Sequence, residues 1–495
     1  MTVETQILLA IIVPLVGMLV IALTGRWPNL REGVTLVTAT VNAVNVWMIL
    51  PTVLEGGRPV VAVIDVLPDL PLKFEVEPLG MMFAIIAATL WIVNSIYSIG
   101  YMRGNNEVRQ TRFYACFALA IVGAMGVAFA GNLLTLFIFY ELLTLSTYPL
   151  VTHKENEDAR RGGRTYLGIL IATSIGLQLP AIIWTYNLTG TTDFQPGGIL
   201  VGQVQGFTAG LLLALYMYGI GKAALMPIHR WLPAAMVAPT PVSALLHAVA
   251  VVKAGVFTVI KVIVYIFGLD LISTEPATNW LIYAAAITLT LASLIAMQQD
   301  NLKRRLAYST VSQLSYVILG AALGVAMGVV GAGMHIAMHA AGKITLFFCA
   351  GAIYVAAHKT EISDMKGLGR VMPVTMFCFM IGALSVIGVP PLGGSWSKTL
   401  IMLGAADAGF QLIIGVLILS SLLNVAYLMP IPLRGFFFRP PGSGDSGPIK
   451  IQEAPLACLI AIVITSVLCV ALFFGADQIY DMLLPITEPG GGARP

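Results

Sequence analysis

Long apolar runs recur along the whole chain and alternate with short polar segments. A helix needs about 20 consecutive apolar residues to cross the hydrocarbon core of a bilayer. The pattern predicts fourteen such helices, at about 5–24, 33–54, 78–101, 113–130, 132–152, 165–187, 206–226, 240–268, 277–299, 304–322, 327–357, 371–402, 408–433 and 454–476. We therefore expect an all-α polytopic membrane protein with about fourteen transmembrane helices.

Lysine and arginine are concentrated in every second loop, and short loops rich in these residues usually face the cytoplasm. The basic loops carry Arg26 and Arg31; Arg103, Arg109 and Arg112; Lys154, Arg160, Arg161 and Arg164; Arg230; Lys303, Arg304 and Arg305; Lys359, Lys366 and Arg370; and Arg434, Arg439 and Lys450. The loops between them carry only Arg58 and Lys73. An even number of spans follows, with both termini facing outward. No basic segment precedes the first apolar run, so we expect it to be a retained span and not a signal peptide.

The composition narrows the class of protein. Of the 495 residues, 58% are hydrophobic and 10% are charged, which excludes an ordinary soluble domain. The net charge of +3 gives no indication of a nucleic-acid partner. The five cysteines lie in apolar runs without C-x-x-C spacing, so they are interpreted as packing residues, and neither a disulfide framework nor a metal site is expected.

Two of the expected spans are interrupted by proline and glycine. The first interruption lies within 218–262, and the second, GVPPLGGSWSK, lies within 385–402. Interrupted spans about five helices apart are typical of inverted repeats, with the ion path at the broken helices. We divide the chain into a three-helix segment (1–112), two five-helix repeats (113–268 and 269–433), and a cytoplasmic loop with the last helix (434–495).

Three loop segments carry weaker signals. Segment 55–76 has an alternating stretch, VVAVIDV, that predicts a short outer hairpin, and the Gly- and Thr-rich segment 190–205 is a second candidate for one. Segment 440–450, PPGSGDSGPIK, is interpreted as a flexible cytoplasmic loop.

Glu141 and Lys222 are isolated charges in apolar sequence. A charged group within a membrane costs at least about 2.5–3.5 kcal/mol on insertion scales, so each needs a partner, and we expect them to pair. Two interpretations stay open: the pair only fixes two helices, or it controls proton release. The second is possible because a buried lysine gives up its proton more readily when its carboxylate moves away.

Lys253 lies near the middle of the eighth span, with His247 towards the cytoplasm and Lys261 towards the outside. The spacing of eight brings Lys261 near the face of Lys253, whereas the spacing of six puts His247 off that face. A line of titratable groups across the membrane is what a proton relay needs. For Lys261, snorkelling or a hydrogen bond to a carbonyl group is an equally open alternative.

His335, His339 and Lys343 recur every four residues in GMHIAMHAAGKITLFF and so share one helix face. A His-x-x-x-His pair can bind zinc, but no Glu follows the first His as in H-E-x-x-H, and the nearby lysine would repel a divalent cation. We expect no metal here. The pattern indicates a polar line from Lys253 towards Lys398, which follows the second interruption.

Several of these segments together resemble the proton-conducting antiporter-like subunits shared by Mrp-type cation/proton antiporters, respiratory complex I and membrane-bound hydrogenases. The segments are YELLTLSTYPL, MPIHRWLPAAMVAPTPVSALLHA, VVKAGV, KRRLAYSTVSQLSY and GVPPLGGSWSK, and the resemblance covers about the third to the thirteenth span. It implies two inverted five-helix repeats with broken seventh and twelfth helices. It also implies that Glu141 and Lys222 form the coupling pair, that Lys253 is the central relay residue fed from the cytoplasm by His247, and that Lys398 is nearest the outer exit. ELLTLSTYPLVTHKE looks most like the D-type subunits of Mrp antiporters, whereas a lysine at 398 also fits some complex I subunits.

The resemblance implies that protons pass through this chain and drive sodium, or another monovalent cation, outward. The chain would act with other membrane subunits in the cell membrane of a bacterium or archaeon. The alternative is a proton-pumping subunit of a redox-driven complex, such as a complex I-like NADH-quinone oxidoreductase or a membrane-bound hydrogenase, or of a carbon-dioxide-concentrating complex. An inert scaffold is disfavoured by the charges within the spans. The sequence holds no flavin, haem, iron–sulfur or G-x-G-x-x-G motif, so no cofactor and no catalytic activity of the chain alone are expected.

Overall fold

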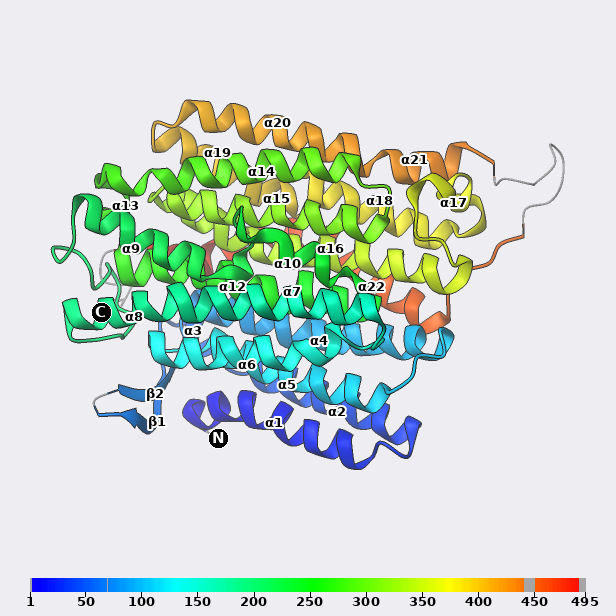
Figure 1. Ribbon diagram of the computed structural model, residues 1–495, viewed down its shortest axis with the longest axis horizontal. Coiled ribbons are helices and arrows are strands. Elements are labelled where there is room, and N and C mark those ends of the chain that lie inside the picture. Colours follow the sequence, from blue (N-terminus) through cyan, green and yellow to red (C-terminus); the bar gives the residue numbers. More distant parts are fainter. Residues whose placement is uncertain (1, 69, 440–449, 489–495) are drawn as a thin grey trace.

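The computed structural model describes residues 2–68, 70–439 and 450–488, which form a bundle of long, nearly parallel helices (Figure 1). Within these residues, ten helical stretches are long and apolar enough to cross a membrane, and two shorter apolar helices accompany them. The protein is therefore an all-α multi-pass membrane protein, as predicted.

The first part of the chain, up to the break near Lys222, is built from the following elements. They are α1 (Val3–Leu23), α2 (Pro28–Trp47), α3 (Leu50–Leu54), β1 (Val60–Leu67), β2 (Leu70–Glu75), α4 (Pro78–Gly104), α5 (Gln110–Ala128), α6 (Leu133–Val151), α7 (Glu157–Thr173), the π-helix η1 (Ser174–Gln178), α8 (Leu179–Thr189), α9 (Gly206–Gly219) and the short η2 (Gly221–Ala223).

The middle of the chain continues through η3 (Ile228–Arg230), α10 (Trp231–Ala234), η4 (Ala235–Val237), α11 (Thr240–Ala244), η5 (Leu245–Val249), α12 (Val251–Val262), η6 (Ile263–Phe267), α13 (Leu269–Thr274), η7 (Pro276–Thr278), α14 (Trp280–Gln298) and α15 (Leu302–Ala322). The last part comprises α16 (Ala326–Ala357), η8 (Ile362–Met365), α17 (Leu368–Val371), α18 (Pro373–Ile387), α19 (Gly394–Asp407), α20 (Gln411–Leu428), α21 (Pro430–Phe437), α22 (Leu456–Phe474), α23 (Ala476–Leu483) and η9 (Leu484–Thr487).

Each of the fourteen predicted runs coincides with one of these helices or with a consecutive group of them. In the seventh run the regular helix α9 ends at Gly219, before the predicted end of the run. The twelfth run is divided between α18 and α19. The eighth is interrupted as well, because the π-helical turn η5 and the non-helical residue Ala250 (φ −125°, ψ −66°) separate α11 from α12. The sequence thus located both breaks, because proline and glycine end helices wherever they occur.

The longest helix, α16, runs through the interior of the bundle, and most of it is buried. Its glycines allow neighbouring backbones to approach, which is how helices pack within membranes. A Cβ on Gly331 would lie 2.9 Å from the backbone nitrogen of Ile401, and one on Gly342 would lie 2.9 Å from a methyl carbon of Val386. The helix that carries His335, His339 and Lys343 is therefore held closely against both halves of the second break.

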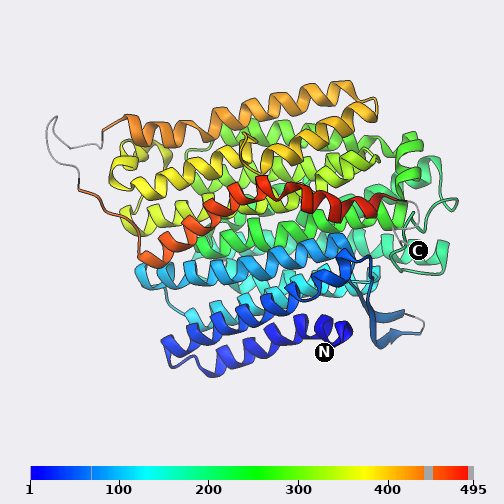
Figure 2. The same ribbon diagram turned by 180° about the vertical axis from the view of Figure 1, so that it is seen from behind.

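Segment 55–76 forms the predicted hairpin, with β1 paired antiparallel to β2. Figures 1 and 2 both place this hairpin at the end of the bundle where α1 begins, and we call that end the hairpin end. The alternative hairpin at 190–205 was wrong: its described residues form turns, with Asp193 bridging to Asn132 and Leu200 donating to the carbonyl oxygen of Ile266. Most of segment 440–450, interpreted as a flexible loop, lies outside the described residues.

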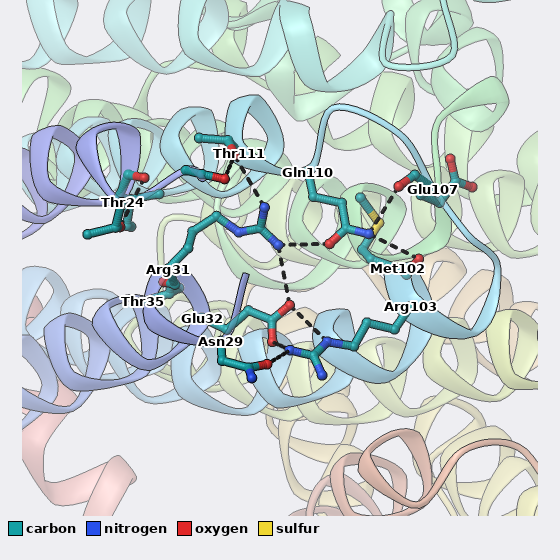
Figure 3. A network of polar contacts seen from close by, with 12 residues as sticks. Thr24, Asn29, Arg31, Glu32, Thr35, Met102, Arg103, Glu107, Gln110 and Thr111 are labelled. Carbon is teal, nitrogen blue, oxygen red and sulfur yellow. Dashed lines mark hydrogen bonds and ion pairs between the residues drawn. The ribbon is translucent and has the colours of Figure 1, made fainter. Parts of the chain in front are cut away.

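The opposite end of the bundle, here called the basic end, carries a polar network that joins α2, α4 and the start of α5 (Figure 3). Arg31 and Glu32 are both 4% exposed. Glu32 forms ion pairs with Arg31, at 3.3 Å, and with Arg103. Arg31 also donates to Gln110 Oε1 at 2.8 Å and Thr111 Oγ1 at 3.2 Å. One buried carboxylate thus holds two arginines from different helices.

Replacing Glu32 with Ala is expected to destabilise the protein by about 3–5 kcal/mol, because it removes the carboxylate that the two arginines share. Thermal unfolding of the detergent-extracted protein measures the change. Glu4→Ala, at an exposed position on α1, is the control and should change stability by less than about 0.5 kcal/mol. An unchanged thermal unfolding midpoint for Glu32→Ala would contradict the view that this carboxylate holds the two arginines.

Candidate functional site

Lys222 lies in the first break, in the short turn η2 that follows α9. Its side chain is fully buried and points towards α6. The Nζ atom donates to the backbone oxygen of Tyr140 at 2.7 Å and to Thr144 Oγ1 at 2.6 Å, and it lies 3.1 Å from the centroid of the Tyr140 ring. The ammonium is therefore held by neutral acceptors and an aromatic face.

Glu141 is on α6, beside Tyr140, and interacts electrostatically with Lys222. The two do not form an ion pair in the described structure, and neither carboxylate oxygen of Glu141 has a hydrogen-bond partner among the described residues. The structure thus brings the predicted coupling residues to one place without joining them.

Lys253 is fully buried in α12, and its Nζ atom lies 2.6 Å from His339 Nδ1 on α16. His339 stacks on His335 one turn away, with ring centroids 5.7 Å apart and planes inclined by 9°. His335 Nδ1 lies 2.8 Å from Ser397 Oγ on α19, next to Lys398. The predicted polar line from Lys253 to the second break is present as a series of contacts.

Lys398 closes this line at the second break, near the start of α19. Its Nζ atom donates to the backbone oxygen of Ile387 at 3.0 Å, which is where α18 ends. It also lies 4.6 Å from the ring centroid of Tyr316, and the same ring stacks on His335 at 5.5 Å. Gly388, which follows Ile387, has φ of 94°, a backbone conformation that favours glycine.

Lys343 shares the helix face of the two histidines but turns towards α15. Its Nζ atom donates to Ser309 Oγ at 2.6 Å and to the backbone oxygen of Leu306 at 3.2 Å. Ser309 in turn accepts a 2.9 Å hydrogen bond from Tyr427, whose hydroxyl also contacts Asn424 on α20. Lys343 therefore belongs to a polar branch directed away from Lys398.

Lys261 makes the carbonyl contact that was one of its open interpretations. Its Nζ atom donates to the backbone oxygen of Ala130 at 2.7 Å and lies 3.5 Å from Glu77 Oε1. Glu77 also accepts from Tyr265 at 3.0 Å and from two backbone N–H groups at the start of α4. The side chain of His247 lies outside the described residues.

Sequence reasoning missed the residues that hold the charged groups, namely Tyr140, Thr144, Ser309, Tyr316, Ser397 and Tyr427. Thr144 is one turn after Tyr140 on the same face of α6, and this was the available signal. Within the described residues, no group of three or more His, Cys, Asp or Glu side chains is placed to hold a metal ion.

Residues 130–424 match the family model described as NADH:quinone oxidoreductase/Mrp antiporter, transmembrane. The match covers both breaks and the buried charged and histidine residues from Glu141 to Lys398. The chain belongs to this family. The family membership predicted from the motifs is therefore confirmed.

Among curated family members, NADH-quinone oxidoreductase subunit N of Desulforudis audaxviator is 29% identical over 85% of this chain and 86% of its own length. The A/B-type subunit of a probable K(+)/H(+) antiporter from Rhizobium meliloti is 32% identical over 80% of this chain, but this chain spans only 41% of its length. A chain in the structure of the Mrp complex from Dietzia sp. DQ12-45-1b has a TM-score of 0.85 at 21% identity, with 99% of this chain and 98% of that one covered. The last comparison shows that the fold is shared over the whole chain.

Gly255 on α12 packs directly against the turn that carries Lys222: a Cβ there would lie 2.4 Å from the carbonyl carbon of Lys222. Gly255→Ala is expected to destabilise the protein by about 1–3 kcal/mol, because backbone cannot yield as a side chain can. Thermal unfolding in detergent measures the loss. Gly415→Ala is the matched control, because a Cβ there meets nothing within 4 Å. Equal midpoints for the two variants would contradict the close approach.

Proposed function

We propose that this chain is the proton-translocating subunit of a multisubunit antiporter that exchanges protons for a monovalent cation, sodium being the first candidate. The observation that supports it best is the line of contacts from Lys253 through His339, His335 and Ser397 to Lys398. Titratable groups buried in a membrane protein mark ion pathways, and here they join two broken helices. The antiporter names of a curated relative and of a solved complex agree with the proposal.

The proposed mechanism starts at the first break. When Lys222 leaves Tyr140 and Thr144 and pairs with Glu141, the carboxylate retains the proton on the ammonium. When the pair opens, the proton passes towards Lys253 and then along the two stacked histidines. Lys398 exchanges the proton with the hairpin side, which we propose to be the outside.

The chain would work with other membrane subunits in the cell membrane of a bacterium or archaeon, with both termini outside and the basic end in the cytoplasm. On its own it would not be an enzyme. The second candidate function is a proton-pumping subunit of a redox-driven complex, favoured by the name of the Desulforudis relative. In that case the electron-transfer chemistry would lie in partner subunits, and an enzyme classification would belong to the complex.

Everted membrane vesicles from cells that lack native antiporters, but carry this chain with its partner subunits, test the two functions. An antiporter dissipates a respiration-generated proton gradient when sodium or potassium is added. A redox-driven pump instead builds a gradient when its electron donor is supplied and does not respond to the cation. Absence of cation-dependent dissipation in vesicles that contain the assembled complex would contradict the proposal.

Glu141→Gln is expected to lower coupled exchange at least about tenfold, because the neutral amide of glutamine offers no negative charge to pair with the ammonium of Lys222. Lys222→Ala should do the same. Assembly, measured by native gel, should be retained, since neither Glu141 oxygen holds another described residue. Normal exchange in an assembled Glu141→Gln complex would show that Lys222 works without this carboxylate.

Lys398→Ala tests the other end of the line. If Lys398 is the outer exit, this variant should also lose proton flux by at least about tenfold, whereas Lys366→Ala, in a basic loop, should keep it. Flux retained in Lys398→Ala would place the exit elsewhere, with the Lys343 branch as the next candidate.

A further inference from the structure

The helix α4 carries buried polar side chains on the side that meets the eighth span. Trp91, Asn94, Ser98 and Tyr101 follow one another at spacings of three and four, so they share a helix face. All four are at most 2% exposed. None of them belongs to the line from Lys253 to Lys398, and a helix that only filled space in a membrane would need no such face.

This face meets the start of α11, which precedes the π-helical turn η5 and Lys253. Asn94 Nδ2 donates to the backbone oxygen of Pro241 at 3.3 Å, and Tyr101 interacts with Thr240. A Cβ on Gly351 of α16 would lie 2.1 Å from the Tyr97 hydroxyl oxygen and 2.8 Å from Thr240 Cβ. Three helices, α4, α11 and α16, therefore pack closely together on the basic side of Lys253, with the polar groups of α4 facing α11.

Polar atoms along this junction lack partners among the described residues. They are Asn94 Oδ1, Trp91 Nε1 and Ser243 Oγ, and each belongs to a residue with 0% exposure. Buried polar atoms nearly always have a partner, and internal water commonly supplies it. Trp91 and Asn94 share the face of α4, and Ser243 lies two residues after Pro241, whose oxygen accepts from Asn94, so these atoms indicate several hydration sites at this junction and not a single trapped water.

At the basic end the face leads to a buried histidine. His153 follows α6 and has 0% exposure, and neither ring nitrogen has a hydrogen-bond partner among the described residues. Its Nε2 atom lies 3.9 Å from Glu107 Oε2. Glu107 also interacts electrostatically with Tyr101 and with Lys303, whose Nζ atom donates to the backbone oxygen of Ala238, two residues before Thr240.

The charges that face His153 are Glu107, Arg112 and Arg109, and the two arginines are both paired with Glu155. Burial lowers the pKa of His153 below its usual range; Glu107 and the backbone of Val108 oppose this effect, and the arginines add to it. The imidazole is therefore neutral near pH 7, with one nitrogen able to accept a proton and the other able to donate one.

We propose that His153 and Glu107 form a proton intake at the basic end, connected to Lys253 by a hydrated file along Tyr101, Asn94 and Ser243. The intake rests on the proposed function and names the residues through which the cytoplasm supplies the relay. It assigns α4, from the three-helix segment before the first repeat, a part in conduction.

Water access can be measured without transport, so the first test does not depend on the proposed function. The assembled complex carries Ser243→Cys or Asn94→Cys in a chain whose five native cysteines are replaced by Ala. Silver ion, a small cation that reacts with thiols only through water, is added to everted or right-side-out vesicles. The thiol that remains is counted by alkylation after unfolding. Ser466→Cys is the control, because Ser466 is 3% exposed and donates to the backbone oxygen of Ile462 at 2.9 Å on α22.

Both file positions should react at least about tenfold faster than Ser466→Cys in everted vesicles, and faster there than in right-side-out vesicles. Reaction at the control rate would overturn the hydrated file. Faster reaction from the hairpin side would overturn its direction. If silver reaches the file but no cation-dependent exchange is found, the intake stands and the antiporter proposal fails.

The second test is functional and uses a matched pair of substitutions. Asn94→Leu removes a buried amide from the file, and Asn45→Leu removes one from α2, where Asn45 donates to the backbone oxygen of Gln6 at 2.8 Å. Asn94→Leu should slow exchange at least about fivefold, with Asn45→Leu near the parent rate. Equal slowing in both variants would show that the amide of Asn94 has only a structural role.

His153→Phe, which keeps the volume and removes both nitrogens, should slow exchange in the same way, and an unchanged rate would remove His153 from the intake.

Discussion

The contact between Lys253 and His339 is the one on which the two halves of the site depend. It joins α12, which follows the first break, to α16, which packs against the second. A buried ammonium must have an acceptor, and an imidazole is an acceptor that can itself take up and release a proton. Without this contact, the groups near Lys222 and those near Lys398 would be two separate sites.

The broken helices provide hydrogen-bond acceptors for buried ammonium groups at other places in the site. A continuous helix uses its backbone oxygens internally, whereas a helix end leaves the last carbonyl groups free. Ile387 lies at such an end, and its oxygen accepts from Lys398. At the first break the turn around Lys222 brings its side chain onto α6, and α12 can lie against that turn because Gly255 has no side chain. The breaks thus both position the lysines and make room around them.

The sequence predicted the span pattern, both breaks and the lysines, because apolar length, proline, glycine and charge act locally along the chain. The stacking of His335 on His339 also followed from their spacing of four. The side chains and backbone oxygens that contact these lysines could not be predicted from the sequence. A search for charge complementarity assigned Lys222 to Glu141, whereas the structure gives it Tyr140 and Thr144. Hydroxyl and carbonyl acceptors are too common in a sequence to be selected without knowing which helices touch. The buried polar face of α4 was missed for the same reason.

The nature of these partners separates the lysines of the proposed relay from the lysine at the hairpin end. In the described structure, Lys222, Lys343 and Lys398 bond to carbonyl or hydroxyl oxygens, and Lys253 bonds to an imidazole. Lys261 also bonds to a carbonyl oxygen, that of Ala130, but it lies in addition 3.5 Å from the carboxylate of Glu77, which caps the start of α4. A carboxylate in a low-dielectric interior holds a proton on its lysine strongly, whereas a neutral acceptor leaves the neutral and charged forms closer in free energy. Proton transfer requires the second situation, and a fixed structural charge requires the first. In the proposed mechanism, Glu141 converts one situation into the other at Lys222, and this requires that the two side chains are not in direct contact in one of the states.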